Sequence, residues 1–372
     1  MTTSTPPLLL TPGPLTTAQS TRHAMTADFG SRDQAFIQIN REVRQELVAL
    51  CADPSEYTAV LMQGSGTFAV EATFGTLLPR DGKALVCING AYGRRITQMI
   101  EVMGRAVVTL KNDETEPTDL VKLDAMLAAD PDITHVAAVH CETTTGMLNP
   151  IEAIAEVTRS HGRELIIDAM SAFGALPLHA SKTPFQAVVA SSNKCLEGVP
   201  GFGYCIARTA DLKAASGNAH SLSLDLSAQL SGFDKNAQWR FTPPTQVIAA
   251  FREALRLHAA EGGVAGRGKR YAENCKTLVE GLRGLGFETL LPDALQAPII
   301  VTVRQPSDPR FHFERFYDAL RDEGFAIYPG KLTQAPTFRV GCIGQVFPED
   351  LTRFVQAVSR VLESQEIASA AP

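Results

Sequence analysis

The chain has 372 residues and 45% hydrophobic content, which suits one large or two modest globular domains with a buried core. Its 34 basic and 40 acidic residues are mixed along the sequence and give a formal net charge of −6, so we expect no nucleic-acid partner. No apolar stretch approaches the ~20 residues that span a bilayer, so we expect no membrane association.

Short apolar runs alternate with segments of helical periodicity through the first two thirds of the chain. The runs are rich in Val, Ile and Ala and are expected to be buried strands, at 58–62, 83–89, 106–110, 135–140, 164–168, 187–192 and 202–207. Helices are clearest at 149–162 and at 242–263, where glycines end the periodic pattern. This alternation is typical of an α/β domain with a mostly parallel, here seven-stranded, sheet.

The pattern changes after about residue 265. Helical segments and apolar runs now follow one another at 270–286, 298–303, 310–324, 325–329, 337–342 and 348–363. We therefore expect a large domain over 18–265 and a smaller C-terminal α+β domain over 266–372. The N-terminal segment 1–17 is expected to pack near the smaller domain.

Ligands of open α/β sheets bind beyond the carboxyl ends of the strands, so polar residues at those ends are candidate site residues. After the first strand, Gly64, Gly66 and Ala69 form GxGxxA at the start of a helix. This pattern resembles a dinucleotide fingerprint, but no acid ends the next strand. A single phosphate held by the Gly66 and Thr67 amides, the Thr67 hydroxyl and the helix dipole is the better interpretation. A tight turn without a ligand remains an alternative.

Two further strand ends carry ambiguous residues. Tyr92 follows the second strand in "NGAYGRR" and could stack on a flat cofactor or simply pack. Thr143 lies in "CETTTG", which could be a hydrogen-bonding loop or an ordinary turn.

Asp168 and Lys194 end successive strands, and each is costly to bury without a partner. Asp168 could be a helix N-cap, and the two together could be a plain salt bridge. They could also bracket a pyridine ring, with the acid on its nitrogen and the lysine on its aldehyde carbon. With a phosphate cup at Gly66 and Thr67, each part of pyridoxal 5'-phosphate would then have a holder.

The cysteines and histidines suggest neither disulfides nor a metal. The seven cysteines are scattered without CxxC spacing, and we expect reduced thiols in a cytoplasmic protein. The histidines lack HExxH or HxxxH spacing, so no metal site is expected. The first fifteen residues contain no Lys or Arg, so a signal peptide is not expected. A cysteine desulfurase would need a nucleophilic thiol on a mobile loop, and Cys195 is expected to point away from the site.

Motifs spread over the chain, from about Leu8 to Val361, closely resemble one family. They are "LLLTPGPLTT", "LMQGSGTFAVEA", "HCETTTGMLNP", "IIDAMSAFG", "SSNKCLEGVPGFG", "SLSLDL", "WRFTPPT", "FAIYPGK" and "FRVGCIG". Together they resemble the 2-aminoethylphosphonate–pyruvate aminotransferases, of the fold-type-I pyridoxal phosphate enzymes. The resemblance implies transfer of the amino group of 2-aminoethylphosphonate to pyruvate, with phosphonoacetaldehyde and L-alanine as products. An alanine–glyoxylate or serine–pyruvate type of aminotransferase is the alternative.

The resemblance also implies roles position by position. Lys194 would be the Schiff-base lysine and proton base, and Asp168 would hold the ring nitrogen. Arg339 would grip the phosphonate or carboxylate of the substrate. The other cofactor-binding positions would be Gly66, Thr67, Tyr92, Thr143, Asn193 and Thr242. Of these, Thr242 would reach the phosphate from the other subunit of a homodimer, so the two subunits would share their active sites.

Overall fold

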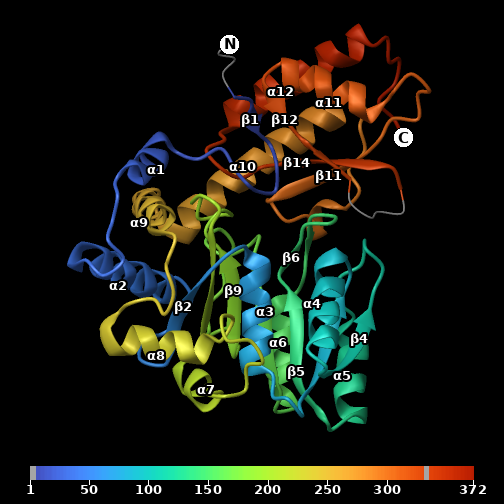
Figure 1. Ribbon diagram of the computed structural model, residues 1–372. Coiled ribbons are helices and arrows are strands. Elements are labelled where there is room, and N and C mark those ends of the chain that lie inside the picture. The colour runs from blue at the N-terminus through green and yellow to red at the C-terminus, as the bar shows by residue number, and fades with distance from the viewer. Residues whose placement is uncertain (1–5, 331–334) are drawn as a thin grey trace.

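The computed structural model describes residues 6–330 and 335–372 and contains two layered parts, one above the other in Figure 1. The lower part is a seven-stranded sheet between helices, and the upper part is a three-stranded sheet with helices on it. The predicted fold class, a mostly parallel α/β sheet with a smaller α+β part, is confirmed.

The large sheet has the strand order β2-β10-β9-β8-β5-β3-β4. Its strands are β2 (Tyr57–Gln63), β3 (Lys83–Ile88), β4 (Ala106–Lys111), β5 (Ile133–Val139), β8 (Glu164–Asp168), β9 (Ala187–Ser191) and β10 (Phe202–Arg208). Within this sheet β10 runs antiparallel to both of its neighbours. The central strands read as continuous apolar runs because helices cover both faces of the sheet. β8 and β9 are parallel neighbours, so their carboxyl ends lie side by side.

The helices of this part surround the sheet (Figure 1). They are α1 (Gln19–His23), η1 (Ala24–Thr26), α2 (Gln34–Ala49), α3 (Gly66–Leu77), α4 (Ala91–Val102), α5 (Leu120–Ala129), α6 (Ile151–Ser160), α7 (Thr209–Ala214), α8 (Leu226–Asn236) and α9 (Thr245–Ala260). A short hairpin of β6 (Cys141–Glu142) and β7 (Met147–Leu148) follows β5.

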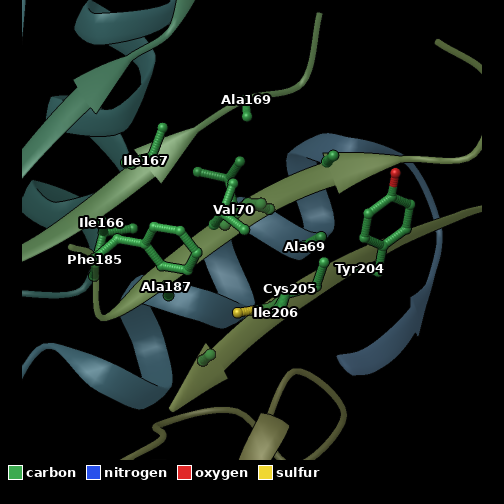
Figure 2. Packing of buried hydrophobic residues seen from close by; sticks show 14 of the residues in the cluster. Ala69, Val70, Ile166, Ile167, Ala169, Phe185, Ala187, Tyr204, Cys205 and Ile206 are labelled. Carbon is green, nitrogen blue, oxygen red and sulfur yellow. The ribbon is translucent and has the colours of Figure 1, made fainter. Parts of the chain in front are cut away.

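Helix α3 packs closely on the middle of the sheet, where small side chains face it. Figure 2 shows Ala69 and Val70 of α3 against buried residues of β8, β9 and β10, including Ile167 and Tyr204. A Cβ at Gly203 of β10 would lie 2.7 Å from the Ala69 Cβ, so glycine is required at this contact. This close packing holds the N-terminus of α3 at the carboxyl edge of the strands.

The upper part has its own core around Phe316, Phe338 and Phe354. Its elements are α10 (Gly263–Gly284), η2 (Asp293–Leu295), β11 (Ile300–Arg304), α11 (Phe313–Asp322), β12 (Phe325–Ala326), β13 (Tyr328–Pro329), β14 (Thr337–Gly341) and α12 (Pro348–Ser364). Helix α9 ends at Ala260, before the glycines as expected, but α10 begins at Gly263 rather than at the expected 270. The positive φ values of Gly262 and Gly263 allow the chain to turn sharply from one helix into the next. The expected boundary at 265 and 266 falls within α10, and the division into domains there stays a prediction.

The N-terminal segment links the two parts. β1 (Leu8–Leu9) pairs in parallel with β12, and Leu10 is buried in the upper core. Beyond it the chain runs against β14, where a Cβ at Gly341 would lie 2.4 Å from the Thr11 carbonyl oxygen. Residues 1–5 of the expected 1–17 segment lie outside the described residues.

Candidate active site

A cavity of about 210 Å³ opens at the carboxyl edge of the large sheet. Six of the predicted site residues line it, namely Gly66, Thr67, Tyr92, Asp168, Asn193 and Lys194. They come from the N-termini of α3 and α4, from the last residue of β8 and from the chain just after β9, as expected for a ligand site of this fold. Residues that the sequence reasoning did not single out also line the cavity, among them Arg95 and Met170.

The amine of Lys194 lies under the N-terminal segment. Its Nζ donates a hydrogen bond to the Pro12 carbonyl oxygen at 2.5 Å. Burial lowers the pKa of Lys194 to about 8, and the positive charge of Arg339 adds to this, while Asp168 opposes it. Gly13 has φ +118° and passes so close that a Cβ there would lie 2.9 Å from Nζ. Glycine at this position therefore permits both the backbone conformation and the close approach.

Asp168 is a buried acid at the end of β8. Its Oδ1 accepts a hydrogen bond from the Met170 backbone N–H at 2.9 Å. Burial raises the pKa of Asp168 to about 6, the charge of Glu142 contributes in the same direction, and Arg95 and Lys194 oppose the rise. A cationic group bound beside it would hold this carboxyl in the ionised form.

The start of α3 forms one wall of the cavity. A Cβ at Gly66 would lie 2.2 Å from the Met170 sulfur and 3.3 Å from the Ser191 Cβ. The first turn of α3 therefore packs tightly on the chain after β8 and on the end of β9. Thr67 follows within the same turn. Backbone N–H groups and the positive end of the helix dipole face the ligand at such a helix start, which favours an anion.

Glu142 holds the start of α4 and was not singled out from the sequence. Its Oε2 accepts from the Tyr92 backbone N–H at 3.2 Å, and its Oε1 accepts from the Thr144 hydroxyl at 2.6 Å. That hydroxyl in turn accepts from the Ala91 N–H at 3.0 Å. Glu142 is fully buried, which raises its pKa, and the Thr144 and Tyr92 hydrogen bonds oppose the rise. The signal available in the sequence was an acid among apolar and threonine residues in "HCETTTG".

Arg339 of β14 is not among the residues that line the cavity, but it lies close enough for its positive charge to lower the pKa of Lys194. Its Nη1 donates to the Thr143 carbonyl oxygen at 2.8 Å and its Nε to the Pro329 carbonyl oxygen at 3.0 Å. Arg339 is 2% exposed, so it is not a surface arginine of the strand. Burial lowers its pKa. The two carbonyls use part of the donor capacity of the guanidinium and fix its plane.

Thr242 lies elsewhere in the same chain. It lines a separate cavity of about 490 Å³ together with Phe68 and Phe241, each 49% exposed. It also lines a third cavity together with Arg32. One chain alone thus does not place Thr242 at the Lys194 cavity.

Cys195 is buried beside Lys194, with its Sγ 3.3 Å from the Ser171 carbonyl oxygen. Burial raises the pKa of this thiol to about 12, which disfavours the thiolate that a desulfurase nucleophile needs. All seven cysteines are buried free thiols. Over residues 6–330 and 335–372, no cluster of His, Cys, Asp and Glu could hold a metal ion. In the same ranges no helix is both long and apolar enough to cross a membrane.

Comparison with known proteins gives consistent matches. The family described as Aminotransferase class-V matches residues 15–346. The 2-aminoethylphosphonate–pyruvate transaminase of Pseudomonas putida (strain W619) is 53% identical over 364 residues, which cover 98% of this chain and 99% of that protein. The protein of that name from Pseudomonas fluorescens (strain Pf0-1) is 54% identical and covers 97% of this chain and 98% of its own. An alanine–glyoxylate aminotransferase from Nostoc sp. superposes with a TM-score of 0.89 at 25% identity, covering 96% of both chains.

Proposed function

The chain belongs to the class-V aminotransferases, and we propose that it transfers the amino group of 2-aminoethylphosphonate to pyruvate, giving phosphonoacetaldehyde and L-alanine. The observation that carries the proposal is the cavity where the Lys194 amine, the buried Asp168 carboxyl and the start of α3 meet. Identity of 53–54% over nearly the full length to transaminases of that name supports the choice of substrates.

Pyridoxal 5'-phosphate is the cofactor that these residues fit. The cavity offers an anion site at Gly66 and Thr67, an acid at Asp168 and an amine at Lys194, which match the phosphate, ring nitrogen and aldehyde. When bound, the cofactor supplies an aldehyde that carries the amino group and a ring that withdraws electrons from the reacting carbon.

The protein side chains then have defined tasks. Ionised Asp168 holds the proton on the ring nitrogen, because an anion there favours the cationic ring. The Lys194 amine, whose pKa burial lowers to about 8, takes a proton from the amino-bearing carbon of the donor and, in the second half of the reaction, delivers a proton to the keto carbon of pyruvate. Tyr92 would provide a ring for stacking and Asn193 would help to hold the phosphate. Thr143, which is not among the residues that line the cavity, would contact the hydroxyl side of the cofactor.

Arg339 is proposed to bind the substrate anion. The donor carries a phosphonate and the acceptor a carboxylate, and a planar guanidinium can hold either through two hydrogen bonds. The Thr143 and Pro329 carbonyls orient the group before a ligand arrives, which reduces the entropy lost on binding.

A homodimer is part of the proposal. Thr242 would approach the phosphate of the partner subunit, because it lies at a cavity of its own in a single chain. The exposed Phe68 and Phe241 beside it give that surface an apolar centre, as interfaces commonly have. A two-fold interface would complete both sites at once. The cytoplasmic location expected from the cysteines stays a prediction.

The alternative, an alanine–glyoxylate or serine–pyruvate type of activity, is separated from the proposal by experiment. Purified protein loaded with pyridoxal phosphate is incubated with 2-aminoethylphosphonate and pyruvate, and L-alanine and phosphonoacetaldehyde are quantified. The same preparation is tested with L-serine and glyoxylate, and Lys194→Ala is the blank. We expect the first pair to react with the higher kcat/KM. Faster reaction of serine with glyoxylate would establish the alternative.

A further inference from the structure

The turn that follows Lys194 contains an unusual backbone conformation. Glu197 has φ +57°, in the left-handed region, although Gly198 is its neighbour. A side chain other than glycine costs free energy in this region. The N–H of Glu197 nevertheless closes the turn on the Lys194 carbonyl oxygen at 2.7 Å. We therefore expect the contacts of the Glu197 side chain to offset this backbone strain.

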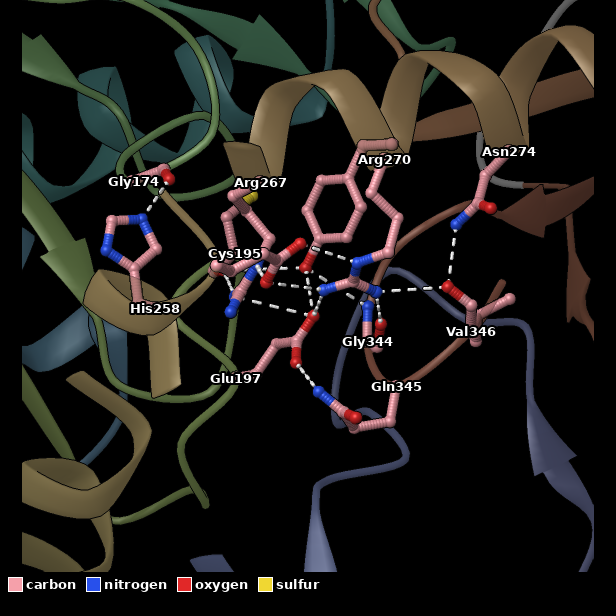
Figure 3. A network of polar contacts seen from close by, with 12 residues as sticks. Gly174, Cys195, Glu197, His258, Arg267, Arg270, Asn274, Gly344, Gln345 and Val346 are labelled. Atoms are coloured by element: carbon pink, nitrogen blue, oxygen red, sulfur yellow. Dashed lines mark hydrogen bonds and ion pairs between the residues drawn. The ribbon is translucent and has the colours of Figure 1, made fainter. Parts of the chain in front are cut away.

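That side chain is the centre of a buried polar network (Figure 3). Glu197 Oε1 accepts from Tyr271 Oη at 2.6 Å and from Arg270 Nη2 at 2.7 Å, both of α10. Its Oε2 accepts from the Gln345 side-chain amide, which follows β14. Arg267 of α10 donates to the Cys195 carbonyl oxygen, one residue after Lys194. The network thus holds the turn after Lys194 at two points, the Glu197 carboxylate and the Cys195 carbonyl oxygen.

The same network holds the chain beyond Arg339. The Gly344 N–H donates to Tyr271 Oη at 3.2 Å, and Arg270 Nη1 donates to the Gly344 and Val346 carbonyl oxygens. Gln345 N–H donates to the Thr16 carbonyl oxygen at 2.8 Å, so the N-terminal segment that covers Lys194 is tied in as well. Glu197 therefore connects the turn that carries the amine with the segment 342–346, which directly continues the strand that carries the substrate-binding guanidinium.

The charges of the network are balanced. Glu197 and Glu261 face Arg267 and Arg270, and Glu261 accepts from the Nε of both arginines at 2.7 Å. Glu197 is 3% exposed and Arg267 1%, so removal of one carboxylate leaves an excess positive charge in the interior. Glu261 differs from Glu197 in two respects. Its side chain is 25% exposed against 4% for Glu197, and its carboxylate accepts from these two arginines, whereas that of Glu197 also accepts from Gln345 of the segment 342–346.

We infer that Glu197 is a positioning residue that sets the spacing between the Lys194 amine and the Arg339 guanidinium. The inference rests on the proposed function, in which Lys194 acts on the amino-bearing carbon of the donor and Arg339 binds the anion of the donor. The anion of 2-aminoethylphosphonate lies one methylene further from the amino-bearing carbon than the carboxylate of L-alanine does. Discrimination between the two donors by length then depends on how rigidly this spacing is held.

The test is the ratio of kcat/KM for 2-aminoethylphosphonate to kcat/KM for L-alanine, measured in half-reactions of the holoenzyme. We expect Glu197→Gln to change this ratio at least five-fold. Glu261→Gln is the matched control, because it removes the same charge from the same two arginines, and it should change the ratio less than two-fold. A loss of folded protein lowers the apparent kcat/KM of both donors by the same factor and leaves their ratio unchanged. A merely structural role of Glu197 therefore does not produce the expected change in the ratio. Gln345→Ala removes the hydrogen bond between Gln345 and Glu197, so it should shift the ratio in the same direction by a smaller factor. This variant replaces Glu197→Gln in the test if Glu197→Gln does not fold.

Hydrogen–deuterium exchange provides a readout that is independent of activity. In the cofactor-free protein, Glu197→Gln should raise the exchange rates of peptides covering 195–198 and 342–346 together, at least several-fold, and Glu261→Gln should not. An unchanged donor ratio with unchanged exchange in these peptides overturns the inference, even if the wild-type protein uses 2-aminoethylphosphonate. If the wild-type protein does not use this donor, the proposed function fails. The exchange experiment alone then decides whether Glu197 connects the turn at 195–198 with the segment 342–346.

Discussion

The substitution Asp168→Asn separates the free-energy cost of burying the Asp168 carboxylate from its proposed role at the cofactor ring. The side chain is 6% exposed, and burial raises its pKa from 3.8 to about 6. Asparagine has nearly the same shape and keeps an oxygen for the Met170 N–H. The substitution therefore removes a charge with little change in packing.

The sign of the effect follows from the two pKa values. The folded chain binds the Asp168 proton more tightly than the unfolded chain, so ionisation of this carboxyl destabilises the cofactor-free fold as the pH rises from about 4 to about 6. The shift from 3.8 to about 6 corresponds to about 3 kcal/mol at pH 7, and to roughly half of that at pH 5. Without cofactor, Asp168→Asn should thus gain up to about 3 kcal/mol at pH 7, or roughly 4 °C in Tm for a chain of this size.

With pyridoxal phosphate bound, we expect the wild-type protein to be more stable than Asp168→Asn. Under the proposed function, pyridoxal phosphate would stabilise the folded state by binding it, and the wild-type anion would pair with the ring nitrogen whereas the neutral amide would not. The assay is thermal unfolding of both proteins at pH 7 and pH 5, with and without saturating pyridoxal phosphate. A variant that is less stable than wild type without cofactor, or a difference that does not shrink at pH 5, would refute the reasoning. Turnover of the variant should also fall by about 10²-fold or more, because the ring is no longer held cationic.

Three further predictions concern the proposed roles. Lys194→Ala should fold normally, as judged by circular dichroism, but lose about 10³-fold or more in turnover, since the proton base is gone; near-normal turnover would exclude Lys194 as that base. Arg339→Lys should lower kcat/KM about 10- to 100-fold for both 2-aminoethylphosphonate and pyruvate, because one ammonium cannot replace the two-point contact of a guanidinium. If both half-reactions survive the change, the anion is held elsewhere, and Arg32 is the next residue to replace. Thr242→Ala should weaken pyridoxal phosphate binding several-fold in a protein that sediments as a dimer; an active monomer would contradict the shared site.

The sequence by itself determined the strands of the large sheet and the polar residues that end them. Continuous apolar runs are required where a parallel strand is covered on both faces, so the pattern marked β5, β8 and β9. A charged residue at or near the end of such a run is costly to bury unless it has a partner, and this pointed to Asp168 and Lys194. Asp168 is the last residue of β8, whereas Lys194 lies three residues beyond Ser191, the end of β9, and not at the strand end as expected. Both inferences follow from local physical chemistry, which needs no knowledge of distant neighbours.

Only the tertiary structure decided how distant segments complete the site. The Pro12 carbonyl that receives the Lys194 amine is 182 residues away in the sequence, and the Thr143 carbonyl that orients Arg339 is 196 residues away. For Glu142 the sequence shows only an acid among apolar and threonine residues, which does not identify its partner, the Tyr92 backbone N–H at the start of α4. The partners of Glu197 include the arginines of α10, one of them 73 residues away in the sequence. Their roles depend on the packing of α4 and α10 against the sheet edge, and periodicity and spacing do not specify which surfaces meet. A buried carboxylate takes its function from whichever donors the fold brings to it.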